Sequence, residues 1–196
     1  MQSNVCKIQQ GSNDLELILK ESEKVAIYNE LDNKQTLQLR LLCEDIDGML
    51  PEILGDFEGK LWIEYENGLC KINVSIEFSQ FTAEKKEELL GIAKNKKNAS
   101  AVGVTGKIRS FLEDVFLDED TRKIMNSVPS SYYLTTGCGD YTYLWSLDEY
   151  KEQVKTEEDK REWDQLEKSV IASVADDVIV GIKGKRADII VIKKFS

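Results

Sequence analysis

The chain has 196 residues, no histidine, and 36 acidic against 26 basic side chains, which gives a formal net charge of −10. This charge disfavours binding to a nucleic-acid backbone, because proteins that bind one carry clustered lysine and arginine. The absence of histidine excludes Ser-His-Asp and Cys-His nucleophiles and any histidine-ligated metal. No apolar run approaches the roughly 20 residues that a membrane helix needs.

The expected compartment is the cytoplasm. The start of the chain, MQSNVCKIQQ, has neither the basic flank nor the apolar stretch of a secretory signal. The four cysteines lie far apart in the sequence, and three of them have apolar neighbours. This pattern is typical of reduced core cysteine and predicts neither a disulfide nor a metal site. The length predicts a single domain over residues 1–196.

The chain is expected to begin with a short strand and a helix. The sequence NVCKIQ, residues 4–9, indicates the strand. Either Ser12 or Asn13 can cap the helix that follows, because their side-chain oxygens can accept from the first free N–H groups. Its apolar residues, from Leu15 to Ala26, recur at helical spacing.

The second predicted helix raises a question about function. It is expected to start near Asp32 or Asn33. It should end or bend close to Gly48, because Pro51 has no N–H and its ring clashes with the preceding turn. Acidic residues lie in its middle, between positions 44 and 47. They either form part of a functional site or lie on the solvated face of an ordinary amphipathic helix.

A β-hairpin is the clearest local signal in the sequence. Asn67-Gly68 joins two runs of alternating apolar and polar side chains, which predicts a type I′ turn. Residues 61–65 and 70–78 should then place one apolar row on a shared buried face.

The middle of the chain is expected to contain a charged helix over residues 83–94, a loop over 95–106 and a helix over 107–116. Residues 131–145, which are rich in tyrosine, are expected to form a second hairpin. Its aromatic side chains either form a binding surface or pack over the sheet.

A long helix is predicted next. Ser146 and Glu149 match a capping box, and Trp163, Leu166, Val170 and Val174 form the later apolar stripe of that helix.

The chain closes on a hairpin of residues 177–182 and 187–195. Residues 189–192 are apolar on both faces, so the tyrosine-rich hairpin or a partner subunit should cover the outer side of that strand. The order of elements predicts an α+β two-layer sandwich. In it, a mixed, mostly antiparallel sheet carries helices on one face, with an added segment at about residues 117–147.

The helix reading L-x-L-L-x-E, residues 39–44, is followed by a hairpin, a small-residue loop with spaced glycines, a helix and a terminal hairpin. This order resembles the GHKL, or Bergerat, ATP-binding superfamily of histidine-kinase-type ATPases. The strand and helix that precede the key helix are most similar to the anti-sigma factor serine kinase branch. The similarity in element order covers most of the chain.

The resemblance implies roles for individual residues. Glu44 matches the glutamate that acts as a base or orienting group in phosphoryl transfer. Gly48 occupies the position of the asparagine that holds magnesium, and it has no oxygen to offer a cation. Where the family has an adenine-reading D-x-G-x-G motif, this chain reads IEFSQFT, with Glu77 as its only acid.

The phosphate-binding loop of the family corresponds to VGVTGKI, residues 102–108. In this stretch the resemblance implies that Gly103, Thr105, Gly106 and Lys107 cradle a phosphate at the start of a helix.

We therefore expect a cytoplasmic regulatory protein that acts by protein–protein interaction, with weakened or lost nucleotide binding, no metal and no firm cofactor. Its expected partner is a regulator, a sigma-like factor or a second copy of the chain. The alternative is an active, Mg-ATP-dependent serine protein kinase of the anti-sigma factor type. In that case Glu44 helps to take the hydroxyl proton, while Thr105 and Lys107 hold phosphates.

Overall fold

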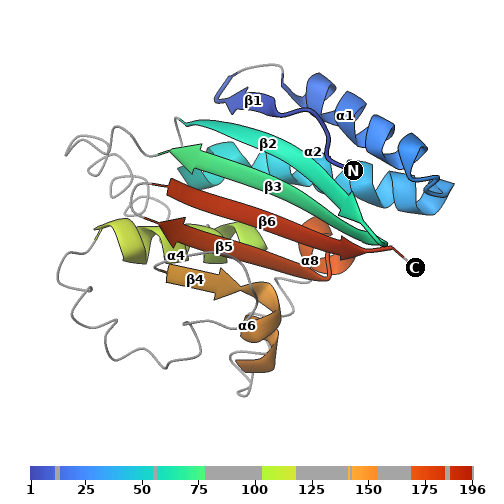
Figure 1. Cartoon of the computed structure of the whole chain (residues 1–196). Coiled ribbons are helices and arrows are strands. Elements are labelled where there is room, and N and C mark those ends of the chain that lie inside the picture. The colour runs from blue at the N-terminus through green and yellow to red at the C-terminus, as the bar shows by residue number, and fades with distance from the viewer. Residues whose placement is uncertain are drawn as a thin grey trace.

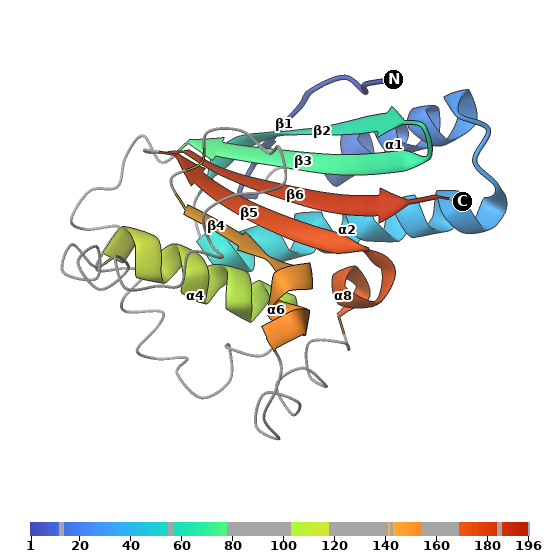
Figure 2. The ribbon, with the colours of Figure 1, turned by 60° about the horizontal axis from the view of Figure 1, so that its bottom comes forward.

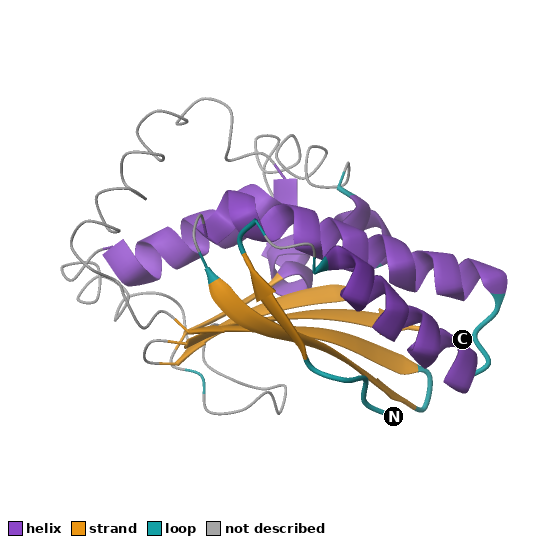
Figure 3. Cartoon of the chain, turned by 90° about the horizontal axis from the view of Figure 1, so that it is seen from above, coloured by secondary structure: helices purple, strands orange, loops and turns teal. Residues whose placement is uncertain are grey.

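The computed structural model describes residues 1–11, 14–54, 57–77, 103–117, 141, 143–153, 169–183 and 186–195, with the backbone alone for 113–117 and 153. These residues form a six-stranded sheet in the order β1-β2-β3-β6-β5-β4, in which every neighbouring pair is antiparallel. Figures 1 and 3 show that the helices gather on one side of this sheet. The prediction of an α+β sandwich with helices on one face is therefore confirmed, whereas the expected mixed sheet is wrong for the described strands, because all of their pairings are antiparallel. The strands are β1 (Cys6–Gln9), β2 (Glu58–Glu66), β3 (Leu69–Glu77), β4 (Tyr143–Ser146), β5 (Asp177–Lys183) and β6 (Arg186–Lys194).

Five helices are described, and the longest, α2, lies along the sheet. Its predicted start is confirmed: Asp32 Oδ1 accepts from Gln35 N at 2.8 Å, and Gln35 Oε1 accepts from Asp32 N at 3.0 Å. This reciprocal pair satisfies two N–H groups at the helix start. The helices are α1 (Leu15–Tyr28), α2 (Asn33–Leu54), α4 (Gly103–Leu117), α6 (Leu147–Gln153) and α8 (Val170–Val174).

Of the two outcomes expected from Pro51, an end or a bend of the second helix near Gly48, the end is wrong. Helix α2 continues through Pro51 to Leu54. A proline inside a helix costs about 3 kcal/mol. Ile53 and Leu54 are 3% and 7% exposed, and burying such side chains stabilises by about 1.5–3 kcal/mol each. Packing of the last turn on the core therefore offsets the cost of the proline.

The Asn67-Gly68 hairpin is confirmed. Both residues have positive φ, 50° for Asn67 and 81° for Gly68, as a type I′ turn requires. A Cβ on Gly68 would lie 2.7 Å from the carbonyl oxygen of Phe195. Phe195 N in turn donates to Gly68 O at 2.7 Å, so this turn also holds the end of β6 in place.

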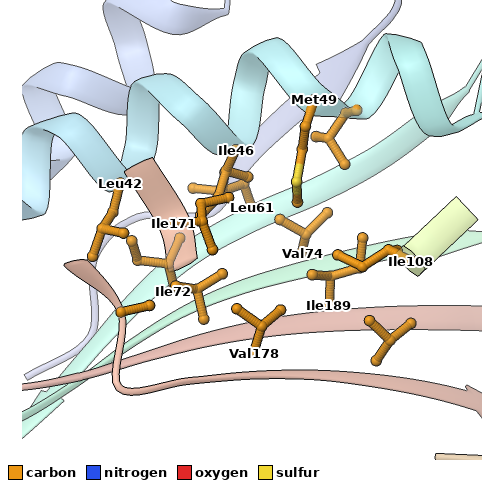
Figure 4. Packing of buried hydrophobic residues seen from close by; sticks show 14 of the residues in the cluster. Leu42, Ile46, Met49, Leu61, Ile72, Val74, Ile108, Ile171, Val178 and Ile189 are labelled. Atoms are coloured by element: carbon orange, nitrogen blue, oxygen red, sulfur yellow. The ribbon is translucent and has the colours of Figure 1, made fainter. Parts of the chain in front are cut away.

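The hydrophobic core lies between the sheet and the helices. Leu42, Ile46 and Met49 of α2 point toward the strands (Figure 4). Ile72 and Ile189, from β3 and β6, face them from the sheet. Since each of these side chains is at most 4% exposed, the inner face of α2 is fully used for packing.

Two predicted helices differ from the structure. Helix α4 starts at Gly103, four residues earlier than expected, because Val104 and Ile108 are buried one turn apart on its inner face. The single long helix expected from Ser146 to Val174 is interrupted, because Ser169 is extended, with φ −78° and ψ 146°, and caps the separate helix α8.

Several expectations fall outside the described residues. These are the helix over 83–94, the caps at Ser12 and Asn13, and most of the tyrosine-rich segment. Of the added segment at 117–147, the structure describes the end of α4, Tyr141, β4 and the first residue of α6. No described helix is both long and apolar enough to cross a membrane.

Candidate functional site

Glu44 lies on the outer surface of α2, where it is part of a short chain of charges between two helices. Its Oε1 accepts from Arg40 Nε at 3.0 Å, and the Glu44 side chain is 37% exposed. Nη1 of Arg40 also lies 3.8 Å from Glu23 Oε1 in α1. Arg40 therefore makes the contact between α1 and α2, and Glu44 is its partner within α2.

Gly48 follows one turn later and is exposed. No atom lies within 4 Å of the point that a Cβ would occupy, leaving out the helix's own nearby backbone. Its neighbour Asp47 is half-buried. Burial and the nearby carboxylate of Asp14 raise the pKa of Asp47. Neither position offers the group of oxygen ligands that a magnesium ion requires.

Asp45 has a structural role that the sequence pattern did not reveal. Its Oδ2 accepts from the backbone N of Ile171, at the start of α8, at 3.0 Å. Ser169 Oγ accepts from Ala172 N, also at 3.0 Å. Together these two oxygens satisfy two of the free N–H groups of α8. Asp45 of α2 thus helps to hold helix α8, through a residue that is 126 positions away in the sequence.

Asp177 of β5 caps helix α6 in a similar way. Its Oδ1 accepts from Asp148 N at 3.0 Å, and its carboxylate also accepts from Ser146 Oγ at 3.1 Å. Ser146 Oγ accepts in turn from Glu149 N at 3.3 Å. The predicted Ser146 cap is therefore present, and a carboxylate from a neighbouring strand supports it.

Glu77 and Glu44 lie on different layers of the molecule. Glu77 is the exposed last residue of β3, and its register partner is Arg186 of β6. Ile76 is buried in the core between the sheet and the helices. Since side chains alternate along a strand, Glu77 is directed to the opposite face of the sheet. The structure therefore does not bring Glu77 together with Glu44.

Residues 103–108 of the predicted phosphate loop lie in the first turns of α4. Gly103 begins this helix with φ +89°, so a residue with a side chain would be strained there. Thr105 and Gly106 lie inside the helix. Lys107 places its Nζ 5.1 Å from the ring centroid of Tyr150 in α6, within cation–π range. Figure 2 shows α4 beside α2 on the same side of the sheet.

The described cysteines are reduced core residues, as predicted. Cys6, Cys43 and Cys70 are free and buried. Burial raises the pKa of Cys70 to about 12 and that of Cys43 still further. Cys138 lies outside the described residues. Among the residues that are described, no cluster of three or more cysteine, aspartate or glutamate side chains could hold a metal ion.

The sheet face that points away from the helices is a second candidate surface, and Figure 1 looks onto it. We call it the open sheet face. Half-buried Trp62, Ile190 and Ile192 lie on it. Trp62 Nε1 donates to Glu64 Oε1 at 2.8 Å. A sequence signal for this surface exists, because Ile190 and Ile192 alternate with the buried residues of β6.

Tyr141 also lies on the open sheet face. A Cβ on Gly181 of β5 would come within 2.7–2.8 Å of the ring carbons of Tyr141. Gly181 is register partner to Asp188, between the core residues Val180 and Ile182. The ring of Tyr141 therefore covers part of the outer side of β5, next to the strand for which a tyrosine cover was expected.

Comparison with known proteins assigns no function to the residues around Glu44 or to the open sheet face. No family model, curated protein or solved structure matched the chain. Among the described contacts, none joins Glu44 to Gly103, Thr105 or Lys107.

Proposed function

We propose that this protein is a cytoplasmic regulatory protein with a GHKL-like sandwich, which acts by binding another protein and works without nucleotide. The order of its described elements supports this architecture: a strand, two helices, a hairpin and a helix, then, after a short strand and two short helices, a final hairpin. The described helices lie on one face of the sheet, and the opposite face carries the half-buried Trp62, Ile190 and Ile192.

One observation carries the proposal. The residues that would serve a nucleotide are separated and engaged elsewhere: Glu44 is paired with Arg40, and Gly48 has no oxygen ligand. Glu77 points to the other face of the sheet. Phosphoryl transfer depends on positioning and on concentrated charge at the phosphates. Residues on opposite faces of a sheet cannot together position one phosphate group and concentrate charge around it.

The open sheet face is favoured over the β1 edge as the contact surface. Backbone N–H groups at two points along the β1 edge already have partners, one in α1 and one at the N-cap residue of α1. Asn4 N donates to Glu21 Oε2 at 3.0 Å, and Gln9 N donates to Asp14 Oδ2 at 3.1 Å. An added strand would have to displace these carboxylates. The open sheet face instead presents aromatic and aliphatic groups, which are common at interfaces.

The test is thermal unfolding with and without Mg-ATP. A ligand at 100 times its Kd adds about 2.7 kcal/mol to the free energy of unfolding. We expect no change in Tm up to millimolar Mg-ATP. The variants Glu44→Ala and Glu16→Ala form a matched pair, because Glu16 makes the same type of i,i+4 contact, with Lys20 in α1. A Tm increase that is lost in Glu44→Ala and kept in Glu16→Ala would refute the proposal.

The alternative function is an active serine kinase. One observation favours it: α4 begins inside the VGVTGK stretch, so the N–H groups of its first turn come from the residues that the resemblance assigns to phosphate. Nucleotide-dependent stabilisation, together with Mg-ATP hydrolysis that is lost in Glu44→Ala, would establish this second function.

A further inference from the structure

The turn between β2 and β3 places an exposed side-chain amide directly before a backbone nitrogen that is not otherwise engaged. Asn67 is exposed, and Gly68 follows it. Within the described part of the chain, no hydrogen bond engages the side-chain amide of Asn67 or the N–H of Gly68. Gly68 also has no side chain that could hinder an approach to its nitrogen. Both groups are therefore available for a reaction with each other.

We propose that Asn67 is a site of spontaneous modification, at which the side-chain amide is converted into an isoaspartyl linkage and, in smaller amount, into an ordinary aspartate. The nitrogen of Gly68 attacks Cγ of Asn67, the bond from Cγ to Nδ2 breaks, and Nδ2 leaves as ammonia with the proton of the Gly68 N–H. Water then opens the resulting cyclic imide at either of its carbonyl groups. Asparagine is among the thermolabile residues, and water is the only co-reactant.

The type I′ geometry of the folded turn slows this reaction. Asn67 has a φ of 50°, and in such a turn the first central residue has a ψ of about +30°. This conformation directs the nitrogen of Gly68 away from the Asn67 side chain. The nitrogen and Cγ can meet only after the turn leaves this conformation, which a local opening of the hairpin end allows. The rate of modification therefore depends on how often the turn opens.

Phe195, which follows β6, opposes that opening. Its N donates to Gly68 O at 2.7 Å, and Figure 1 shows the end of β6 beside the turn. Its ring stacks on Tyr65, with the ring centroids 6.4 Å apart and the planes at 20° to each other. Phe195 is 8% exposed and belongs to the hydrophobic core. A buried aromatic residue far away in the sequence thus holds the turn closed.

An isoaspartyl linkage changes the length of the turn, because it carries the main chain through the Asn67 side chain and so adds one backbone atom. Glu66 and Leu69 flank the two turn residues and are register partners. Loop length and turn type fix the register of a hairpin. The longer backbone therefore cannot keep this pair and the bond between Gly68 and Phe195 in their present geometry. We expect the hairpin end and the end of β6 to loosen together.

The first residues of the chain are attached at the same place. Met1 N donates to Tyr65 O at 2.6 Å, and Tyr65 N donates to Met1 O at 2.8 Å. Tyr65 in turn stacks on Phe195. One chemical event at Asn67 therefore affects a junction of β2, β3, the end of β6 and the first residues. Since ammonia is lost, refolding does not reverse the change.

The first test is peptide mapping by mass spectrometry after incubation of the full chain in mildly alkaline buffer. We expect Asn67 to be converted, mainly to isoaspartate, before conversion is measurable at the described asparagines that precede a residue with a side chain. These are Asn4, Asn29, Asn33 and Asn73. Conversion at Asn67 that is no faster than at these asparagines would overturn the proposal.

The second test separates opening of the turn from a general loss of stability. Phe195→Leu keeps an apolar side chain in the core but removes the stack on Tyr65. We expect conversion at Asn67 to become up to about tenfold faster, equivalent to about 1.4 kcal/mol, as for the loss of an aromatic pair. The matched control is Ile18→Val, at a fully buried position in α1, which should leave the rate unchanged. Equal acceleration in both variants, or none in Phe195→Leu, would refute the control of the turn by Phe195.

The third test compares the products of the reaction. The isoaspartyl form, separated by ion exchange, and the variant Asn67→Asp carry the same additional negative charge, but only the first has the longer backbone. We expect the isoaspartyl form to unfold at a lower urea concentration, and its Phe195 amide to exchange faster. Equal stability of the two would refute the loosening of this end of the sheet. None of these outcomes depends on Mg-ATP binding, so this proposal and the proposed function can fail separately.

Discussion

The cap that Asp45 provides for α8 allows a quantitative test of the role of the acidic stretch in α2. In Asp45→Ala, the N–H of Ile171 loses its acceptor at a partly buried position. Loss of a helix cap costs about 0.5–2 kcal/mol, and loss of a hydrogen bond to a charged group about 1.5–3 kcal/mol. We therefore expect Asp45→Ala to lower the free energy of unfolding by about 2 kcal/mol.

Two further variants separate the hydrogen bond from the charge. Asp45→Asn keeps an oxygen that can accept from Ile171 N, so it should lose only the charge interaction with the helix start, about 0.3–1 kcal/mol. Glu44→Ala removes the neighbouring acid, whose surface pair with Arg40 contributes about 0.3–0.5 kcal/mol. The expected order of destabilisation is Asp45→Ala, then Asp45→Asn, then Glu44→Ala.

Urea unfolding followed by circular dichroism measures these differences. For a chain of this length, 1 kcal/mol corresponds to a Tm change of about 2–4 °C, so a parallel thermal scan should show the same order. Equal stability of Asp45→Ala and Glu44→Ala would refute the structural role of Asp45. It would also reopen the possibility that the acids between positions 44 and 47 serve a ligand.

The remaining predictions concern ionisable groups near the N-terminal half of the core. Burial opposes ionisation of Glu21, but hydrogen bonds from Lys24 and Asn4 outweigh it and hold the pKa of Glu21 below its ordinary value of 4.5. Its contribution to stability is therefore present above that pH and is lost as the pH falls through the lowered pKa. Glu21→Gln should be about 1–3 kcal/mol less stable at pH 7 and lose less stability on acidification; an unchanged pH profile in denaturant titrations would contradict this. Cys43 and Cys70, with raised thiol pKa values, should be alkylated at pH 8 only after unfolding, because the thiolate is the reactive form. Labelling of either residue in the folded chain, detected by peptide mass spectrometry, would show that the core opens.

Local patterns predicted the parts of the fold that depend on neighbouring residues. The turn at Asn67-Gly68 needs two positive φ values, and few residue pairs other than Asn-Gly supply them readily. The alternation in β2 and β3 assigned Leu61, Ile63 and Ile72 to the core because the side-chain period of a strand is two. These signals lie within a few residues of the structure that they specify.

Tertiary contacts decided the features that the sequence pattern missed. Pro51 stays inside α2 because the turn that contains it packs on the core. The break before α8 depends on Ser169 and on Asp45, which are far apart in the sequence. No periodicity in either segment indicates that they meet.

The candidate nucleotide site was predicted from the order of elements, and that order does not fix which way a side chain points. Glu77 follows the core residue Ile76 at the end of β3, so its orientation away from the helices could have been predicted from alternation alone. The pairing of Glu44 with Arg40 was also readable from their i,i+4 spacing. Both clues favoured separate surface residues over a single site.

The central claim is that Glu44, Gly48 and the start of α4 form no nucleotide site, and residue-resolved NMR tests it most directly. Amide shifts of the ¹⁵N-labelled chain should be recorded during a titration with Mg-ATP. We expect the chemical shifts of the Gly48, Thr105 and Lys107 amides to remain unchanged up to millimolar nucleotide. Saturable changes in the chemical shifts of all three amides would contradict the claim.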